Sequence, residues 1–201
     1  MELNNWEDRD QSFLSKVFDG DSKDIIEFLK NSSIGKVVEV GFGNSRLLPK
    51  ILAIDDNIKY FGIDKTSSFV ERAKREFSGI PEVTFYRLNI SNLSEFSKLI
   101  KVIKPDVLIL RYIIEHLPKW IETLRNINEL EIPNLLISIH TPYVKHHTWS
   151  VFDISNDFSN AYTLNFFCEK NIDNKLTNYE TTDILTYNKV PHTFRVYKLI
   201  K

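Results

Sequence analysis

Cysteine is nearly absent from this sequence, and its scarcity excludes two kinds of site. Cys168 is the single cysteine, so the chain can form no intramolecular disulfide and no zinc centre built from several thiolates. Apolar runs are short, and none approaches the roughly 20 residues that a membrane-spanning helix requires. The first nine residues are polar and acidic, unlike a signal peptide. We therefore expect a cytoplasmic protein with no bound metal and no membrane partner.

An excess of charge of either sign is also missing. The 26 basic and 27 acidic residues give a formal net charge of -1, so no strongly basic balance favours a nucleic-acid partner. Hydrophobic residues make up 42% of the chain and charged residues 26%, as in ordinary globular proteins. With 201 residues, these values predict one domain with a sizeable core and a small-molecule partner. They leave the oligomeric state undetermined.

The middle of the sequence alternates short apolar runs with amphipathic segments. The runs have the composition of strands, and the segments between them repeat apolar residues at helical spacing. One run, 106–110, is apolar enough to be buried on both faces, as parallel strands are. This alternation predicts a parallel sheet with helices on both faces. Strands are expected at residues 36–40, 59–63, 83–88, 106–110 and 134–139, and helices at 44–54, 67–77, 93–102 and 120–130.

The two ends of the sequence follow this rhythm less closely. Residues 1–33 are expected to form a helical extension or lid, and residues 34–201 the main domain. The C-terminal part alternates well enough for an antiparallel hairpin. The prediction is an α/β, doubly wound, mostly parallel seven-stranded sheet that ends in this hairpin. The remaining elements are expected as a helix at 22–30, an irregular stretch at 143–155, a helix at 157–169, and strands at 181–187 and 193–200.

A strand followed by a glycine turn is the sharpest local signal. It reads Val37-Val38-Glu39-Val40-Gly41-Phe42-Gly43-Asn44-Ser45. Gly41 and Gly43 let the backbone approach a ligand closely and adopt dihedral angles that other residues resist. The helix expected next would offer its first N–H groups to an anion, such as the carboxylate of a methionyl moiety. Taken alone, the segment is also compatible with a plain strand-to-helix turn.

Polar residues follow the ends of the next two strands. Asp64 comes about 20 residues after the glycine turn, a spacing at which a carboxylate reaches both hydroxyls of an adenosine ribose. Asn89 and Ile90 follow the third strand, where the amide would bond the adenine edge and the isoleucine would pack on its face. An ordinary Asx turn is the alternative at Asn89. Because doubly wound sheets bind ligands at the carboxyl ends of their strands, we expect one nucleoside pocket.

These residues resemble a known family. The segment Glu39-Val40-Gly41-Phe42-Gly43-Asn44-Ser45 resembles motif I of class I S-adenosylmethionine-dependent methyltransferases, with Ser45 in place of the third glycine. Gly62-Ile63-Asp64-Lys65-Thr66-Ser67-Ser68 is similar to the segment whose acid holds the ribose. Tyr112-Ile113-Ile114-Glu115-His116-Leu117 is similar to the Glu-His-Leu signature of many members that act on small molecules. The resemblance covers about residues 34–140 and implies the Rossmann-like methyltransferase fold.

The resemblance implies S-adenosylmethionine as the cofactor and S-adenosylhomocysteine as the product. Glu39, Gly41 and Gly43 would contact or admit the methionyl part. Asp64, with Lys65 beside it, would hold the ribose.

The same resemblance assigns the rest of the cofactor site. Asn89 and Ile90 would hold the adenine, although the family more often has aspartate at position 89. Arg111 would lie near the sulfonium through its backbone carbonyl. Trp6 and Arg9 are similar to an N-terminal aromatic–arginine pair that covers the cofactor in some members and pairs with its carboxylate.

Four residues are candidates for the acceptor side of the reaction. The methyl group would pass by in-line displacement to an O, N or S atom of a small metabolite, with the protein mainly aligning the reacting atoms. His140, His116 and Tyr143 are candidates for a general base, His140 first because it ends the fifth strand. Arg111 could pair with a carboxylate or phosphate of an anionic acceptor, or instead with a nearby acid such as Glu115.

Two other functions share part of this pattern. A Rossmann-type NAD(P)-dependent oxidoreductase needs a third glycine where Arg46 stands. A methyltransferase fold kept as a catalytically silent binding protein is the second alternative. The intact glycine turn and Asp64 argue against the decayed cofactor site that this second alternative implies.

Overall fold

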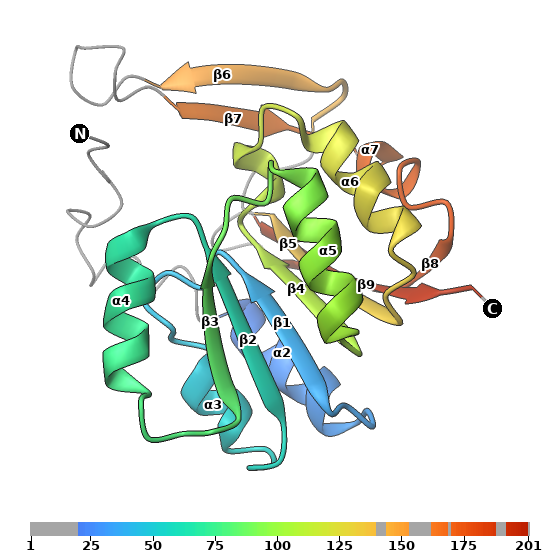
Figure 1. Cartoon of the computed structure of the whole chain (residues 1–201). Helices are drawn as coiled ribbons and strands as arrows, with labels where there is room; N and C mark the ends of the chain where they lie inside the picture. Colours follow the sequence, from blue (N-terminus) through green and yellow to red (C-terminus); the bar gives the residue numbers. More distant parts are fainter. Residues whose placement is uncertain (1–19, 140–143, 153–161, 169, 188–191, 201) are drawn as a thin grey trace.

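Five parallel strands form the centre of the fold (Figure 1). The computed structural model describes residues 20–139, 144–152, 162–168, 170–187 and 192–200. The strand order of the main sheet is β3-β2-β1-β4-β5-β9-β8, with β9 antiparallel to both β5 and β8. This is the seven-stranded, mostly parallel sheet with a terminal hairpin that the sequence predicts. The strands are β1 (Lys36–Val40), β2 (Lys59–Asp64), β3 (Val83–Arg87), β4 (Val107–Arg111), β5 (Asn134–Ile139), β8 (Tyr179–Tyr187) and β9 (His192–Leu199).

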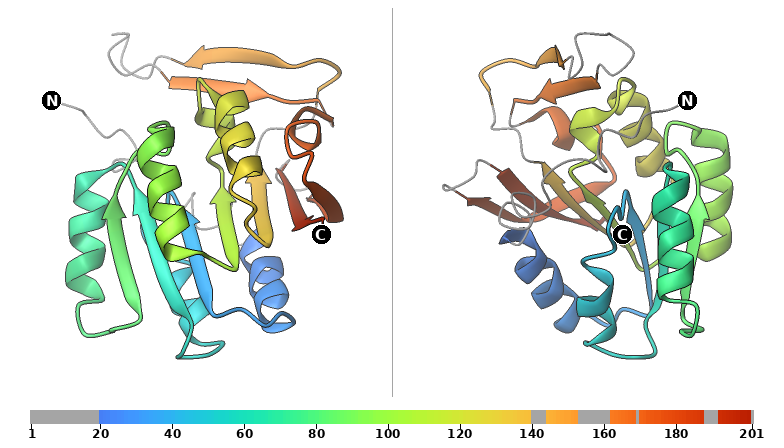
Figure 2. Two further views of the ribbon diagram at one scale, coloured as in Figure 1. Left: turned by 45° about the vertical axis from the view of Figure 1, so that its right-hand side comes forward. Right: turned by 90° about the vertical axis from the view of Figure 1, so that its left-hand side faces the viewer.

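Helices cover both faces of this sheet (Figure 2). The two-residue period of the strands divides their apolar side chains between two cores. In β1, for example, Val37 packs with the first set of helices, and Val38 and Val40 pack with the second. The first set is α2 (Gly20–Lys30), α3 (Leu48–Leu52) and α4 (Ser67–Glu76), and the second is α5 (Leu93–Ile103), α6 (Trp120–Glu129) and α7 (Lys170–Asp173).

The strand order creates a crevice at the carboxyl edge of the sheet. From β1 the chain winds outward to β2 and β3, then returns to β4 on the other side of β1. The loops that follow β1 and β4 therefore leave the sheet in opposite directions, which opens a ligand site between them. The glycine turn lies after β1, and residues 112–117 lie after β4. Both segments singled out in the sequence thus meet at this crevice.

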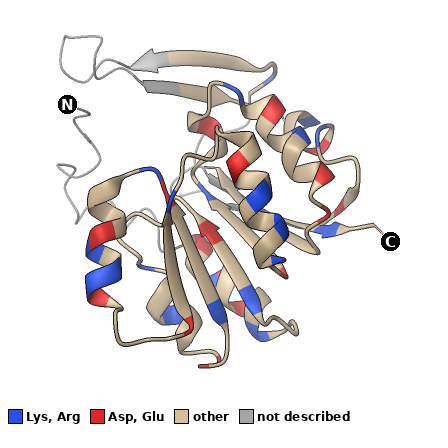
Figure 3. Ribbon diagram, viewed as in Figure 1, with Lys and Arg blue, Asp and Glu red and all other residues tan. Residues whose placement is uncertain are grey.

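Charged residues of both signs are spread over the helices. Figure 3 shows basic and acidic residues interspersed on α4 and α5, in keeping with the formal net charge of -1. The helix expected at 22–30 is confirmed as α2, while residues 1–19 lie outside the described part of the chain. No helix among the described residues has both the length and the apolar character needed to cross a membrane.

The helix after the glycine turn is shorter than the sequence predicts. Instead of residues 44–54, α3 spans Leu48–Leu52. Ser45 has a φ of 54°, in the left-handed region that a right-handed helix cannot contain. Pro49 occupies the first turn, where its fixed φ and missing N–H are tolerated. The apolar side chains expected to be buried here are still buried, because Leu47, Leu48 and Ile51 pack into the core.

The prediction is wrong for residues 148–152 and 162–166, while residues 143, 153–161 and 169 lie outside the described part of the chain. In place of an irregular stretch and a helix, β6 (Thr148–Phe152) and β7 (Tyr162–Phe166) pair as a separate antiparallel sheet, drawn above the main sheet in Figure 1. The physical reason is a two-residue period: Asn165 and Phe167 are buried, whereas their neighbours are half-buried. Asn165 Nδ2 donates to the carbonyls of Glu115 at 3.0 Å and Leu117 at 3.2 Å. The strand is therefore fixed by the loop after β4.

Candidate active site

A cavity of about 600 Å³ opens at the crevice beside β1 and β4. Its volume falls within the roughly 300–1,000 Å³ of small-molecule sites. Segments after β1, β2, β3 and β4 contribute to its walls. The structure thus brings most of the predicted site residues together. Those that line the cavity are Glu39, Gly41, Gly43, Asp64, Lys65, Asn89, Ile90, Arg111 and His116.

The two glycines are required by the shape of the turn. Gly41 has a φ of 71° and Gly43 a φ of 51°, values that side-chain-bearing residues rarely adopt. A Cβ at Gly41 would lie 2.1 Å from Ile113 Cδ1, whereas a Cβ at Gly43 would meet no heavy atom within 4 Å. Gly41 therefore lets the segment after β4 pack against the turn. Gly43 presents bare backbone to the cavity.

Asp64 is joined to the glycine turn by a hydrogen bond. Its Oδ2 accepts from the Gly43 N–H at 3.1 Å, and its Oδ1 accepts from the Thr66 N–H at 2.9 Å. The carboxyl is buried, and burial raises its pKa against the lowering effect of these two bonds. The sequence predicts that Asp64 faces the glycine turn across a ligand site, and the contact confirms that they are adjacent.

The helix expected directly after the glycine turn begins later, at Leu48. The N–H of Gly43 donates to Asp64, and the N–H of Ser45 donates to the Phe42 carbonyl at 2.8 Å. Binding of an anion by N–H groups of this segment stays a prediction.

Glu39 presents a buried carboxylate to the same cavity. Its Oε2 accepts from the Tyr60 hydroxyl at 2.6 Å. Burial raises its pKa to about 7, although Arg111 and Tyr60 both act to lower it. Sequence reasoning missed Tyr60, but a signal was present. Tyr60, Gly62 and Asp64 alternate along β2, and residues at this spacing share one face of a strand.

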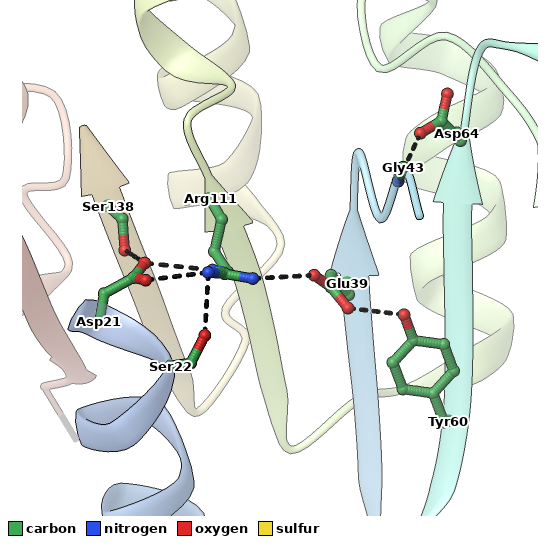
Figure 4. Close-up of polar contacts among 8 residues, drawn as sticks. All are labelled: Asp21, Ser22, Glu39, Gly43, Tyr60, Asp64, Arg111 and Ser138. Atoms are coloured by element: carbon green, nitrogen blue, oxygen red, sulfur yellow. Dashed lines mark hydrogen bonds and ion pairs between the residues drawn. The ribbon is translucent and has the colours of Figure 1, made fainter. Parts of the chain in front are cut away.

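Arg111 forms a buried ion pair that the sequence does not predict (Figure 4). Its Nε donates to Asp21 Oδ2 at 3.1 Å, its Nη2 donates to Asp21 Oδ1 at 2.9 Å, and its Nη1 lies 3.9 Å from Glu39 Oε1. A nearby acid is one of the two alternatives that the sequence leaves open for Arg111, and among the described residues its hydrogen-bonded acid is Asp21 of α2 rather than Glu115. Burial alone would lower the pKa of Arg111, but the two carboxylates outweigh it and raise that pKa. Asp21 carries no recognisable motif, so no signal in the sequence identifies it.

Residues after β2 and β3 line the end of the cavity that the sequence predicts for the nucleoside. Ile90 is buried and Lys65 is exposed at the rim. Asn89 is exposed, and its Oδ1 accepts from the Ser91 N–H at 3.0 Å. The Asx turn that the sequence allows at this position is therefore present. The same oxygen keeps a second lone pair for a ligand.

His116 lies at the cavity wall on the β4 side. It ends a 3-10 helix, η1 (Ile114–His116), which is held from above by the two hydrogen bonds of Asn165. Tyr112, at the start of this segment, has a φ of 55°. A non-glycine residue in this conformation stores strain and marks functional loops. Several residues of this segment line the cavity: Tyr112, Ile113, His116, Leu117 and Pro118.

Four predicted site residues lie outside the described part of the chain. They are Trp6, Arg9, His140 and Tyr143.

Comparisons with known proteins agree with this geometry. Residues 38–134 match a family model described as a methyltransferase domain. This segment is therefore similar to a methyltransferase domain, and it contains the acidic residue, glycine turn and Asp64 that the sequence predicts for binding S-adenosylmethionine. No curated protein matches the chain.

Solved structures share this methyltransferase fold at low sequence identity. One is a Burkholderia thailandensis 1,6-didemethyltoxoflavin-N1-methyltransferase with bound 1,6-didemethyltoxoflavin and S-adenosylhomocysteine (TM-score 0.66, 14% identity, covering 94% of this chain and 86% of that one). Another is the N-terminal domain of EvdMO1 with S-adenosylhomocysteine bound (0.64, 10%, 90% and 82%). A third is an S-adenosylmethionine-dependent methyltransferase from Clostridium acetobutylicum (0.65, 12%, 89% and 90%).

The residues that line the cavity fit S-adenosylmethionine chemically. S-adenosylmethionine carries an ammonium group, a sulfonium and two ribose hydroxyls, which are cations or hydrogen-bond donors. Glu39 and Asp64 present two buried carboxyl groups to the cavity, and a Cβ at Gly43 would meet no heavy atom within 4 Å. Carboxylates are suitable acceptors for such groups.

Alanine substitutions are expected to separate the roles of the two glycines. Gly41→Ala should destabilise the methyltransferase fold by about 2–4 kcal/mol, because the new Cβ collides with Ile113 at a left-handed φ. Gly43→Ala should cost only about 1–2 kcal/mol for its left-handed φ but weaken S-adenosylhomocysteine binding about tenfold, because its Cβ enters the cavity. Denaturant unfolding and calorimetry measure the two effects. Gly79→Ala, where a Cβ meets no atom within 4 Å, is the control, and equal losses of affinity in all three variants would contradict the assignment.

Proposed function

We propose that this methyltransferase transfers a methyl group to an O, N or S atom of a small-molecule acceptor by in-line displacement. The observation that carries the proposal is the cavity of about 600 Å³ beside β1 and β4. Its carboxylate-bearing end suits the cofactor, and its other wall is mostly apolar. A concave site of this size supports a small acceptor rather than a polymer.

The cofactor end would be formed by the predicted residues. Glu39 would bind the ammonium of the methionyl part, Asp64 the ribose hydroxyls, and Ile90 the adenine face, with Asn89 and Lys65 at the rim. When bound, S-adenosylmethionine supplies a methyl group on an excellent leaving group. The chain's own contribution is therefore alignment, which can be worth about 7–11 kcal/mol.

The acceptor would lie against the segment after β4. Ile113, Leu117 and Pro118 line this wall, and His116 stands among them. His116 is half-buried there and would accept the proton when the nucleophile must lose one, a contribution of about 10²–10⁴-fold in rate. His140 and Tyr143 remain sequence-based candidates for the same role.

The charge balance at Arg111 favours an uncharged acceptor over an anionic one. The guanidinium is already paired with Asp21, and Glu39 lies 3.9 Å away. Binding an acceptor carboxylate or phosphate there would require breaking a buried ion pair, which is costly. Arg111 is thus better suited to organising the cofactor end than to binding substrate.

Labelled methyl transfer tests the proposal. The protein is incubated with S-adenosylmethionine carrying an isotopic methyl label and with cell extract, and the products are divided by ultrafiltration into small and macromolecular fractions. We expect the label in the small-molecule fraction, with S-adenosylhomocysteine formed in equal amount. Asp64→Ala is the inactive control. Label in protein or nucleic acid would refute a small acceptor, and tight S-adenosylhomocysteine binding without transfer would indicate a silent binding protein.

A further inference from the structure

Arg111 is shared unequally between two buried carboxylates. It contacts both oxygens of Asp21 at hydrogen-bond distance, but its nearest approach to Glu39 is 3.9 Å. That separation is an ion pair too long for a hydrogen bond. Figure 4 shows the guanidinium lying between the two acids, closer to Asp21. Glu39 therefore interacts electrostatically with Arg111, but at this separation its Oε1 accepts no hydrogen bond from Nη1.

Asp21 is fixed independently of Arg111. Its Oδ2 accepts from the Ser138 hydroxyl on β5 at 2.6 Å, and its side chain is fully buried. Ser22, the next residue of α2, accepts from Arg111 Nη2 at 3.1 Å. The start of α2 is thus attached to both β4 and β5, so the position of this helix determines where the guanidinium is held.

The other side of Glu39 is fixed by β2. Tyr60 donates its hydroxyl to Oε2, while Oε1 is the oxygen that faces Arg111. Glu39 also lines the cavity. Its carboxylate is therefore oriented from one side by a neutral donor and from the other by a cation held at a distance.

We infer that Asp21 is a positioning residue that holds Arg111 back from Glu39, so that the docking of α2 sets the affinity for the cofactor's ammonium group. Without the Asp21 charge, Glu39 is the other carboxylate of the described residues within ion-pair distance of the guanidinium. Arg111 then competes with the ammonium for the same carboxylate. Asp21 thereby affects the contact between Glu39 and the ammonium group without touching the ligand. Through Asp21, α2 influences the cofactor site.

The charges that face Glu39 give this arrangement a characteristic pH dependence. The groups are Arg111 from β4, Tyr60 and Asp64 from β2, and Asp21 from α2. The pKa of Glu39 is about 7, raised by burial, lowered by Arg111 and raised by Asp21. An ammonium ligand binds the ionised carboxylate, so affinity should rise as the pH increases through about 7. Removing the Asp21 charge lowers the pKa of Glu39 and moves this midpoint to lower pH.

The test is calorimetric titration of S-adenosylhomocysteine over a range of pH on either side of neutrality. Asp21→Asn is expected to weaken binding at the high-pH plateau by about five- to tenfold and to shift the midpoint down by about half a pH unit. Glu27→Gln removes the same charge from an exposed position of α2 and should change neither value. An unaltered midpoint and plateau in Asp21→Asn would overturn the inference.

Two further measurements separate this role from a merely structural one. Methylthioadenosine, which keeps the ribose but lacks the ammonium, should bind Asp21→Asn and the wild type equally. A matching loss of methylthioadenosine binding would show general damage and overturn the inference. If Asp21→Asn does not fold, the double variant Asp21→Asn/Arg111→Met removes both charges. Arg111 affects the pKa of Glu39 more than Asp21 does. The pH midpoint of binding by the double variant should therefore lie above that of the wild type. An unchanged midpoint would refute the coupling of Glu39 to Arg111 and Asp21.

Discussion

Replacing Asp64 with alanine is expected to weaken S-adenosylhomocysteine binding by about 10- to 100-fold, the cost of losing hydrogen bonds to a charged acceptor. Two losses combine in this variant. The ribose would lose the carboxylate that accepts from its hydroxyls. The Gly43 N–H would lose its hydrogen-bond acceptor, Asp64 Oδ2, which lies 3.1 Å from the Gly43 nitrogen. Calorimetry on the purified variant gives the dissociation constant directly. An affinity equal to that of the wild type would reject Asp64 as part of the cofactor site.

Asp55→Ala is the matched control for this variant. Asp55 also accepts a backbone N–H within a turn, from Asn57 at 2.9 Å, but it is exposed at the opposite end of β2 from Asp64. Its removal deletes the same side chain and the same kind of turn contact away from the cavity. We therefore expect unchanged S-adenosylhomocysteine affinity. A loss as large as that of Asp64→Ala would mean that the effect comes from charge or general stability.

Arg111→Leu is expected to destabilise the protein by about 3–5 kcal/mol, the usual cost of removing one partner of a buried ion pair. The substitution would leave Asp21 with no guanidinium at a position where its side chain is fully buried, and would remove the cation nearest Glu39. Denaturant unfolding measures the free energy of unfolding. A loss below about 1 kcal/mol, in the range of surface ion pairs, would contradict the buried pairing.

A second substitution, at Asp21, should partly restore the free energy of unfolding that Arg111→Leu loses. In Arg111→Leu/Asp21→Leu the unpaired carboxylate is gone, and apolar replacements of a whole buried pair are often tolerated. The double variant should therefore be more stable than Arg111→Leu alone. Arg125→Leu, at an exposed position of α6, is the control for loss of an arginine and should change the stability little. A double variant less stable than the single one would show that Asp21 stabilises the fold without Arg111.

The β6–β7 hairpin shows why part of the fold could not be predicted. Residues 157–169 are rich in aromatic side chains, which suit a helix or a strand equally when the partner is unknown. Asn165 favours the strand over the helix, because its amide donates hydrogen bonds to the carbonyls of Glu115 and Leu117, about 50 residues earlier. Trp120 and Phe167 then pack edge to face, with ring centroids 4.9 Å apart. Contacts of this kind leave no periodic trace in the local sequence.

The candidate site also contains residues that the sequence predicts and residues that it does not. Glu39, Gly41, Gly43 and Asp64 could be found because each stands at a strand end or in a turn, at a spacing that reflects backbone geometry. Asp21 could not be found, because its partner Arg111 is 90 residues away and neither lies in a pattern that points to the other. The role of Arg111 was accordingly left open between a substrate anion and a nearby acid.

The sequence by itself determined the strands of the main sheet, their parallel arrangement, the terminal hairpin and the residues that line the cavity after β1, β2 and β3. Hydrophobic period and glycine conformation are local properties, and they act in the same way wherever the segment lies. Only the tertiary structure decided that α2 supplies the counter-charge of Arg111 and that residues 162–166 form a strand. Those outcomes depend on which buried charges and amides meet after folding, since burial makes an unsatisfied partner costly.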